Sequence, residues 1–430
     1  MKLVIEGATL ITMDDEEVIQ DGILIIEGQH IEYAGGRAGA PAAGSGKLIR
    51  AAGKYVLPGF INLHCHLFQV FLRTLGPDLN LLDWLRTVIW PVVHRYSAPA
   101  VAAAARLGIA ENVRSGVTCL VDMNYGNPHF EAVLEAFADT RIRGFLSRGF
   151  YEIEANPRLL ESAASILQST AALMEKYPNV FPGPMHPCYV SKDLLSKTKE
   201  LAEAYRRPFY THLAESEGDI RLLVQREGKR DAELLHELGI LNERLIGVHS
   251  CNLTDQEIEA LGRTRSNTVH CPTSNMYIAD GVSPLGRLAG AGANICLGTD
   301  GAASTGRLDM FSEMKTASLL QKIHHMDPAQ ITARDILRMA TVNGAKALGI
   351  RAGLLKRGYL ADVTVLDMQR VNTVFSYDPI SAVVYSANTE NVDTVIVDGN
   401  ILLEDKRFTN IDEERTIAEG QQAASRLLLR

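Results

Sequence analysis

Two histidines, His64 and His66, lie two residues apart in the segment PGFINLHCH. On a β-strand, side chains two positions apart leave the same face, so both imidazoles can reach one metal ion. Alternation on a half-exposed strand produces the same spacing without a metal, so the pair alone is a weak signal. His212 and Asp300 end two other strand-like segments, and the four side chains together offer three neutral nitrogens and one carboxylate oxygen. This set suits one divalent ion with a position open for water, and we predict Zn²⁺, with Fe²⁺ and Mn²⁺ as alternatives.

A further carboxylate, Glu215, follows His212 by three residues in the segment THLAESE. Glu215 and Glu217 could simply begin a helix, because the helix dipole favours acidic side chains there. Beside the predicted metal ligands, however, a carboxyl group is also placed to carry protons during catalysis. We predict this role for Glu215 and keep the helix start as the alternative.

Composition excludes several other classes of protein. The six cysteines are scattered singly, with no Cys-x-x-Cys pair, which indicates buried free thiols and leaves the metal to His, Asp and Glu. The net charge is −8 with acids and bases interspersed, so we expect no nucleic-acid partner. Neither an apolar membrane span nor a signal-peptide core is evident. These features predict a cytoplasmic protein without a membrane partner.

The elements that must position the candidate residues alternate between strand-like and helical patterns in the middle of the chain. Eight nearly continuous apolar runs cover 56–64, 117–123, 143–150, 179–187, 208–215, 244–250, 266–272 and 293–300. Continuous apolarity suits strands that are buried on both faces. Eight strand and helix units predict an α/β fold, a TIM-like (β/α)₈ catalytic barrel over residues 56–358. Because the carboxyl ends of barrel strands meet at one mouth, the candidate histidines and carboxylates would share one cavity.

Both ends of the chain carry shorter alternating patterns that are broken by Gly and Asp. They lie in KLVIEGATLITM, GILIIEG and HIEYAGG near the start, and in LADVTVLDM and VDTVIVDGNILLE near the end. Neither end alone has many strands. We therefore predict a composite small β-sandwich domain built from residues 1–55 plus 359–430.

The order and spacing of several segments resemble the amidohydrolase superfamily, in particular its mononuclear deaminase branch. The matching segments are PGFINLHCH, THLAES, GVHS, HCPTSNMYIADGVSPL, LGTDGAAS, MATVNGAKALG and GYLADVTVLD. The resemblance implies a metal site made of His64, His66, His212 and Asp300. It also implies that Glu215 and His249, together with Asp300, handle the protons of water and substrate. The fourth run ends without the lysine that binuclear members use to bridge two metals, which implies a single-metal site.

Within that superfamily the chain resembles the group of 5′-methylthioadenosine/S-adenosylhomocysteine deaminases and 5′-deoxyadenosine deaminases, through LLDWLRTVIWP and LGTDGAASTGRLDMFSEMKTASLLQKIHHMDP. The resemblance implies that Asp83 binds the ribose and that Trp84 or Trp90 walls the pocket. It also implies that Arg148 faces the tail of a carboxylated substrate and that His186 reaches the purine or the sugar. Two departures concern the substrate: the family usually has Glu where this chain has Asp83, and HPCYVS around His186 matches loosely.

The predicted activity is metal-dependent hydrolytic deamination of an aminopurine nucleoside such as 5′-methylthioadenosine, S-adenosylhomocysteine or 5′-deoxyadenosine. Gln69, three residues after His66, could touch the substrate ring or cap a loop. Another small heterocyclic substrate, such as an s-triazine, guanine or 8-oxoguanine, is the alternative within the same mechanism. A metal-free scaffold protein is the alternative from another class, but it would not be expected to keep the whole ligand set. The sequence leaves the oligomeric state open, and a homo-oligomer is compatible with it.

Overall fold

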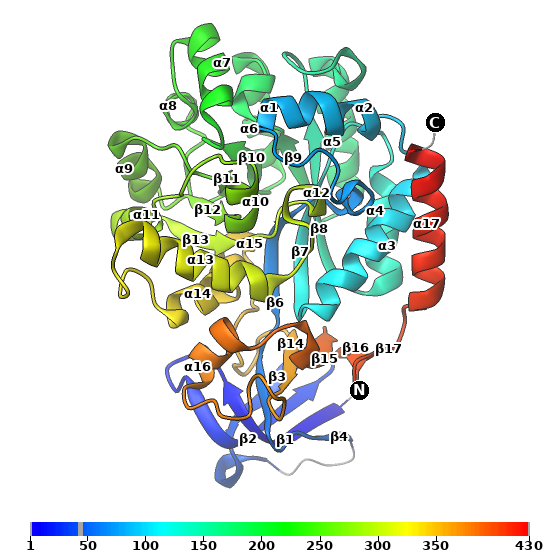
Figure 1. The fold of residues 1–430 in the computed structure, drawn as a ribbon, viewed down its shortest axis with the longest axis vertical. Helices are drawn as coiled ribbons and strands as arrows, with labels where there is room; N and C mark the ends of the chain where they lie inside the picture. Colours follow the sequence, from blue (N-terminus) through cyan, green and yellow to red (C-terminus); the bar gives the residue numbers. More distant parts are fainter. Residues whose placement is uncertain (1, 42–45, 429–430) are drawn as a thin grey trace.

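The computed structural model describes residues 2–41 and 46–428, and two parallel sheets form its centre (Figure 1). The first sheet contains β6 (Phe60–Cys65), β7 (Val117–Asn124), β8 (Arg143–Phe150) and β9 (Val180–Pro184). The second contains β10 (Phe209–Leu213), β11 (Leu245–His249), β12 (Asn267–His270) and β13 (Asn294–Leu297). Each apolar run predicted from the sequence overlaps one of these strands, in the predicted order, and the first run also covers residues 56–58, which belong to a strand of another sheet.

The two sheets lie edge to edge. Strand β9 lies beside β10, and β13 lies beside β6. At the first seam the backbone N–H of His212 donates to the carbonyl of Met185 at 3.2 Å, and at the second the N–H of Asp300 donates to the carbonyl of His64 at 2.9 Å. The expected TIM-barrel-like α/β class is therefore confirmed, and both seams end at candidate site residues.

Helices connect the strands and cover the outside of the two sheets (Figure 1). Apart from two short helices in the insertion after β6, those between β6 and β11 are α3 (Ala98–Arg114), α4 (Phe130–Thr140), α5 (Ala163–Lys176), α6 (Lys192–Ala204), α7 (Glu217–Glu227) and α8 (Asp231–Glu237). Those that follow β11 are α9 (Asp255–Arg263), α10 (Pro272–Tyr277), α11 (Leu285–Ala291), α12 (Ala302–Thr305), α13 (Met310–His325), α14 (Ala333–Met339) and α15 (Val342–Leu348).

A long insertion between β6 and α3 contains a 3₁₀-helix (Leu67–Leu72), α1 (Leu81–Trp84), a π-helix (Leu85–Ile89) and α2 (Trp90–Val93). The side chain of Asn80 caps α1 by accepting from the N–H of Asp83 at 3.1 Å. Leu82 packs against the first turn of α7 at Gly218, where a Cβ would lie only 2.8 Å from Cδ1 of Leu82. Glycine thus lets the insertion approach α7, and Leu81, Trp84 and Leu85 are buried beneath it.

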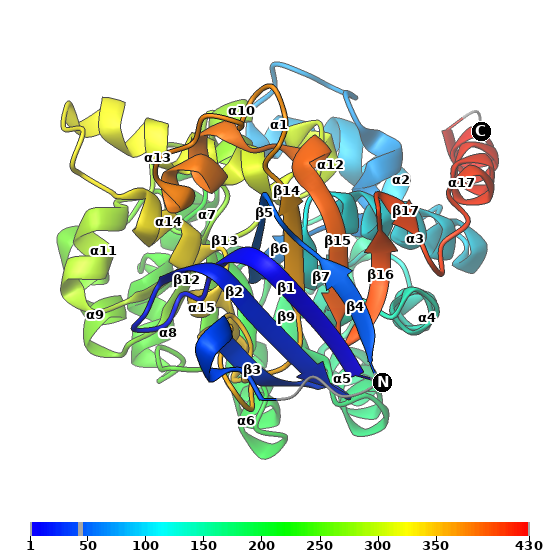
Figure 2. The same cartoon turned by 90° about the horizontal axis from the view of Figure 1, so that it is seen from below.

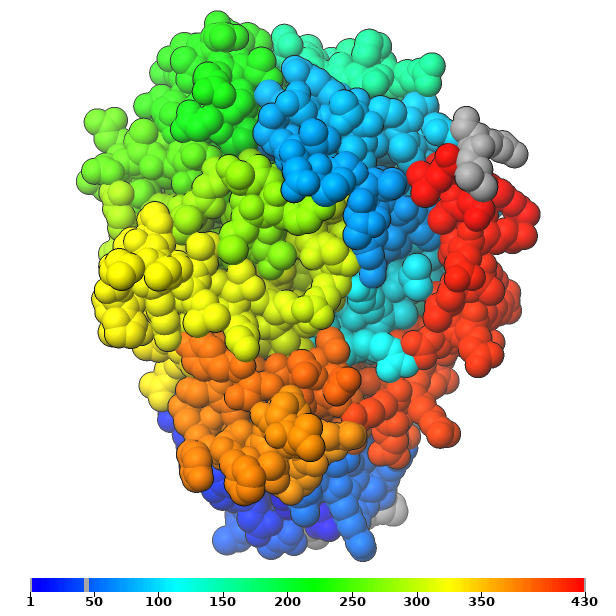
Figure 3. All heavy atoms as spheres, viewed as in Figure 1, coloured from blue at the N-terminus to red at the C-terminus, as the bar shows by residue number. Residues whose placement is uncertain are grey.

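Strands from both chain ends form one nine-stranded sheet, and Figures 1 and 2 show the blue and orange strands side by side. Its order is β17 (Arg407–Phe408), β16 (Asn400–Glu404), β15 (Val392–Val397), β14 (Val363–Asp367), β5 (Lys54–Pro58), β1 (Lys2–Ile11), β2 (Val18–Glu27) and β3 (His30–Gly36), with β4 (Lys47–Arg50) paired to β1. The two ends join where β5 pairs with β14. In the space-filling view of Figure 3, the blue residues near the start of the chain and the orange residues near its end accordingly lie together in the lower part.

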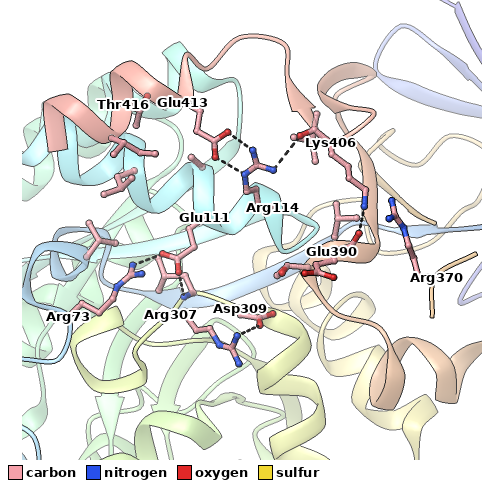
Figure 4. Close-up of a pocket in the computed structure, with 18 residues that line it drawn as sticks. Arg73, Glu111, Arg114, Arg307, Asp309, Arg370, Glu390, Lys406, Glu413 and Thr416 are labelled. Atoms are coloured by element: carbon pink, nitrogen blue, oxygen red, sulfur yellow. Dashed lines mark hydrogen bonds and ion pairs between the residues drawn. The ribbon is translucent and has the colours of Figure 1, made fainter. Parts of the chain in front are cut away.

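The last helix, α17 (Glu413–Leu428), packs against α3 on the outside of the barrel-like region rather than on the nine-stranded sheet (Figure 1). Beside it, a peripheral cavity of about 930 Å³ lies among α3, α17 and the loop before α13 (Figure 4). Arg114 at the end of α3 donates to Glu413 of α17 at 2.9 Å and to the carbonyl of Lys406 at 3.3 Å. In the part of the chain that the structure describes, no helix has the length and apolarity needed to cross a membrane.

Candidate functional site

The carboxyl ends of the central strands surround one buried cavity. The metal-binding and catalytic residues predicted from the sequence lie together around this cavity. They are His64, His66, His212, His249, Glu215 and Asp300. None of the six is more than 6% exposed. They come from β6, β10 and β11 and from the segments directly after β6, β10 and β13, so a parallel arrangement of strands accounts for their convergence.

Hydrogen bonds fix the same tautomer for all four histidines. Nδ1 of His66 donates to the carbonyl of Met123 at 2.7 Å, and Nδ1 of His212 donates to the carbonyl of Met185 at 2.5 Å. Nδ1 of His249 lies 2.7 Å from Oδ1 of Asn275, an acceptor. Each ring therefore holds its proton on Nδ1 and keeps a lone pair on Nε2, which is how metal-ligating histidines are held.

The fourth ring, His64, is fixed through a tyrosine. The Tyr210 hydroxyl donates to the carbonyl of Leu63 at 2.9 Å, so its oxygen accepts from Nδ1 of His64 at 2.7 Å. Nε2 of His64 has no hydrogen-bond partner among the described residues, although it is buried. A buried nitrogen lone pair without a donor is costly, and a cation would satisfy it.

Asp300 adds a carboxylate oxygen to these lone pairs. Its Oδ1 lies 3.2 Å from Nε2 of His64 and 3.4 Å from Nε2 of His66, yet neither nitrogen carries a proton to donate. The carboxylate itself is held by the Ser274 hydroxyl at 2.5 Å and by the N–H of Gly301 at 2.6 Å. Three electron pairs thus face one another, an arrangement that a divalent cation between them would stabilise.

Two overlapping groups of donor atoms can hold that ion. In one, His64, His66 and Asp300 place their ligand atoms within 4.8 Å of one another, and in the other His64, His212 and His249 do so. Burial lowers the pKa of His64 to about 3 and also lowers the pKa values of His66, His212 and His249. Neutral imidazoles at physiological pH are what metal coordination requires, so the residues present fit a divalent metal.

Glu215 faces the same cavity with a different electrostatic environment. Burial raises its pKa well above the ordinary value, and the nearby carboxyl groups of Asp280 and Asp219 raise it further. Its Oε1 lies 3.4 Å from Nε2 of His249. A buried carboxyl group that keeps its proton near neutral pH can act as a general acid.

Three of the residues predicted to bind substrate also line the cavity: Gln69, Trp84 and His186. Nε1 of Trp84 and Oε1 of Gln69 are buried without a partner anywhere in residues 2–41 and 46–428. One is a donor and the other an acceptor, so both are available to a polar ring.

Asp83 and Arg148 are not brought to this cavity. Asp83 is exposed on α1, where its Oδ2 accepts from the side chain of Asn80 at 2.7 Å. The Arg148 side chain points outward from β8, between α4 and α5, where it donates to Glu161 at 2.5 Å and to Ser169 at 3.0 Å. Trp90 is buried, but its Nε1 donates to the Tyr151 hydroxyl at 3.2 Å. In the segment that resembles the family, Trp84 therefore lines the cavity and the carboxylate of Asp83 does not.

Several residues at the site were not predicted from the sequence. Tyr125 and Tyr151 line the cavity and directly follow β7 and β8, so their place just after a strand was an available signal. Tyr210, which orients His64, lies two residues before His212 and could have been found by strand alternation. Asn275 and Ser274 lie on α10 and carry no comparable signal.

The chain belongs to the amidohydrolase family, whose model matches residues 55–402. It is 41% identical over 360 residues to the 5-methylthioadenosine/S-adenosylhomocysteine deaminase of Thermococcus kodakarensis, a match that covers 83% of this chain and 84% of that protein. It is 36% identical over 432 residues to the 5′-deoxyadenosine deaminase of Methanococcoides burtonii, covering 100% of this chain and 98% of the relative.

A solved structure extends this likeness to three dimensions. The crystal structure of an adenosine deaminase from Xanthomonas campestris with bound zinc has a TM-score of 0.91 and 27% sequence identity to this chain. The match covers 100% of this chain and 99% of that one. The resemblance inferred from the sequence segments is therefore confirmed at the level of the family.

Proposed function

We propose that the protein is a metal-dependent hydrolytic deaminase of an aminopurine nucleoside such as 5′-methylthioadenosine, S-adenosylhomocysteine or 5′-deoxyadenosine. One observation carries the proposal: four Nδ1-protonated histidines and Asp300 place their free electron pairs in two overlapping groups that share His64, beside Glu215, whose pKa burial raises. Relatives named as deaminases of such nucleosides, at 36% and 41% identity, support the substrate class.

His64, His66, His212 and Asp300 would hold the metal, and we propose Zn²⁺. Three nitrogens and one oxygen suit zinc, and the related adenosine deaminase contains it. A divalent ion at this position supplies Lewis acidity that makes water reactive near neutral pH. His249, whose Nε2 lone pair is free, would orient the attacking water.

The remaining chemistry falls to protons that the side chains carry. Glu215 donates its proton to the ring nitrogen beside the carbon under attack, because that nitrogen gains electron density as the ring loses aromaticity. Asp300 accepts a proton from the water and returns it to the amino group. The carbon–nitrogen bond then breaks, ammonia leaves with the bonding pair, and the carbon becomes a carbonyl as its hydroxyl proton passes to Glu215, which restores the acid. One water is consumed for each ammonia released.

Substrate entry requires the insertion after β6 to move. The cavity has about 30 Å³ of free volume, which is room for a water molecule but not for a purine. Leu81, Trp84 and Leu85 close it from the insertion, and Ile278 closes it from the segment after α10. Opening of this wall, with Trp84 and Gln69 then contacting the ring, is part of the proposed cycle.

We also propose that the eight parallel strands close into a complete (β/α)₈ barrel over residues 56–358. Hydrogen bonds at both seams support closure. We further propose that the strands of the ranges 1–55 plus 359–430 form the small β-sandwich domain, which the pairing of β5 with β14 supports, whereas α17 at the end of the second range packs against α3 instead.

The test is ammonia release from a panel containing 5′-methylthioadenosine, S-adenosylhomocysteine, 5′-deoxyadenosine, adenosine, adenine, guanine, 8-oxoguanine, a pterin and an amino-s-triazine. We expect the 5′-substituted adenosines to have the highest kcat/KM, with conversion of the adenine ring to hypoxanthine. Turnover of the triazine or a free base without turnover of any nucleoside would contradict the proposed substrate class.

A further inference from the structure

The turn that carries Glu215 has a strained backbone. Ala214 has a φ of 46°, in the left-handed region that side chains with a Cβ rarely adopt. Its carbonyl accepts from the N–H of Cys251 at 3.1 Å and from that of Asn252 at 3.0 Å. Its own N–H donates to Oδ2 of Asp231 at 3.0 Å. Strain of this kind persists only where surrounding contacts over-determine the conformation, and Asp231 supplies one of them.

The same oxygen of Asp231 also faces a residue in another wall of the cavity. Oδ2 lies 3.3 Å from Nε2 of His186, and the two side chains are 0% and 2% exposed. The N–H of Cys188 donates to Nδ1 of His186 at 3.2 Å, so the ring carries a proton on Nε2, on the side of Asp231, and this 3.3 Å approach is an electrostatic contact without hydrogen-bond geometry. One carboxylate oxygen therefore joins the Glu215 turn to the His186 ring.

Asp231 is costly to bury, which argues that its contacts matter. Its Oδ1 has no hydrogen-bond partner within the described residues. The adjacent Arg230 turns away to Glu257 at 3.0 Å and to the carbonyl of Asn252. A buried carboxylate that no Lys or Arg side chain among the described residues pairs with loses solvation that its other contacts must offset. The start of α8 is nevertheless held firmly, because Arg230 ties it to the segment after β11.

We propose that Asp231 is a positioning residue for the deamination: it holds the Glu215 turn and the His186 ring in the relative placement that the reaction needs. Asp231 does not line the cavity, so it acts through Ala214 and His186. The inference rests on the proposed function. Misplacement of reacting groups by about 1 Å can cost about 100-fold in rate, which sets the size of the expected effect.

Three variants separate positioning from general stabilisation. Asp231→Ala removes both contacts and should lower kcat/KM about 100-fold. Asp231→Asn keeps an oxygen that can accept from the N–H of Ala214 and remain beside Nε2 of His186, and it should stay within about fivefold of the native protein. Ala214→Gly in the Asp231→Ala background should recover at least about fivefold, because glycine reaches positive φ without the Cβ penalty.

A double-mutant cycle with His186→Gln tests the second contact. If Asp231 acts partly through His186, the two losses should combine to less than their product. The matched control is Asp362→Ala. Asp362 is another buried carboxylate, but it lies away from the cavity, where its Oδ2 is 2.6 Å from Nε of Arg143. That variant should lower Tm and leave kcat/KM unchanged.

The proposal is overturned by native kcat/KM in Asp231→Ala, by equal damage in the Asn and Ala variants, by the absence of rescue by glycine, or by a cycle without coupling. If Asp231→Ala does not fold, Asp231→Asn and the Asp231→Ala/Ala214→Gly protein are judged by the same criteria.

Failure of the proposed function is detected separately, because it would leave the native protein inactive on the whole panel. In that case ¹⁵N spectra of histidine-labelled protein, with His186 assigned by difference from His186→Gln, test the positioning alone. Asp231→Ala should shift the His186 signals, and an unchanged spectrum overturns the proposal whatever the reaction.

Discussion

The two cavities of this protein differ in how their polar groups are satisfied. The peripheral cavity beside α17 is large, about 930 Å³, and several of its charged side chains pair with one another, as Figure 4 shows for Arg73 with Glu111 and for Arg307 with Asp309, although Nε of Arg73 has no partner in the described residues. The catalytic cavity has about 30 Å³ of free volume, but it contains buried atoms such as Nε2 of His64 and Nε1 of Trp84 that lack a partner in the described chain.

This difference shows that volume alone is a poor guide to function here. Folding normally pairs buried polar groups, so several unpaired ones around a single cavity indicate a position where an ion or a substrate completes the bonding. Groups in the catalytic cavity should therefore control activity, and groups in the peripheral cavity should control stability. The following changes test that division, beginning with the largest expected effect.

Removal of the metal should have the largest effect. The purified protein should contain about one divalent ion per chain, and exhaustive chelation should lower turnover by at least about 100-fold, because no other group at the site can activate water. Metal analysis and ammonia release measure both, and added Zn²⁺ should restore activity. Full turnover in metal-free protein would contradict the interpretation of the unpaired lone pairs.

Glu215→Gln should come next. The amide keeps the shape but has no acidic proton, so kcat should fall about 10²- to 10⁴-fold while the metal content stays native. Because burial raises the pKa of Glu215, the protonated, active form is present below that raised pKa, and kcat should fall as pH rises through it. The Gln variant should lack this alkaline decline. Loss of metal from the variant would instead make Glu215 a ligand.

Trp84→Phe should have an intermediate effect. It keeps an aromatic wall but removes the unpaired Nε1 donor, so kcat/KM should fall about 3- to 10-fold, as expected for one hydrogen bond to substrate. Trp90→Phe is the matched control, since its Nε1 already donates to Tyr151. Equal effects of the two substitutions would show that the Trp84 donor does not reach the substrate.

The backbone positions of the site residues could be predicted from the sequence, whereas the contacts of their side chains could not. The strand ends that carry His64, His212 and Asp300 were predictable because buried parallel strands have a distinct apolar pattern and their carboxyl ends converge. The tautomers were not, because they depend on Met123, Met185 and Asn275, which approach from elements distant in the chain.

The sequence pattern also could not predict which side chains line the substrate side of the cavity. Asp83 and Trp84 are neighbours on a short helix, and adjacent helical residues point about 100° apart, so one faces the cavity and the other faces solvent. Arg148 lies on β8 with a side chain directed outward, which nearly continuous apolarity in the strand did not reveal.

Asp83→Ala should accordingly have a small effect, even though the resemblance implies that this carboxylate binds ribose. An exposed carboxylate that bonds to Asn80 should change kcat/KM for 5′-methylthioadenosine less than about twofold when removed, as for most surface positions. Steady-state kinetics on this nucleoside and on adenine decide the matter. A strong rise in KM confined to the nucleoside would show that Asp83 turns toward the sugar when the wall opens.

Arg114→Met should have the smallest effect on catalysis, namely none, and it tests the other half of the comparison. Arg114 connects α3 to α17 through Glu413, and its guanidinium lies 4.8 Å from the ring centroid of Phe408. The Arg114 and Glu413 side chains are 38% and 44% exposed, so solvent screens the pair and Tm should fall only about 1–2 °C. Arg143→Met provides the contrast, because it leaves Asp362 buried without its cation. The decrease in Tm should be several times larger than for Arg114→Met. Calorimetry and ammonia release on the same samples separate the two properties. A loss of activity in Arg114→Met at native metal content would mean that the peripheral cavity communicates with the catalytic one, and the division between them would fail.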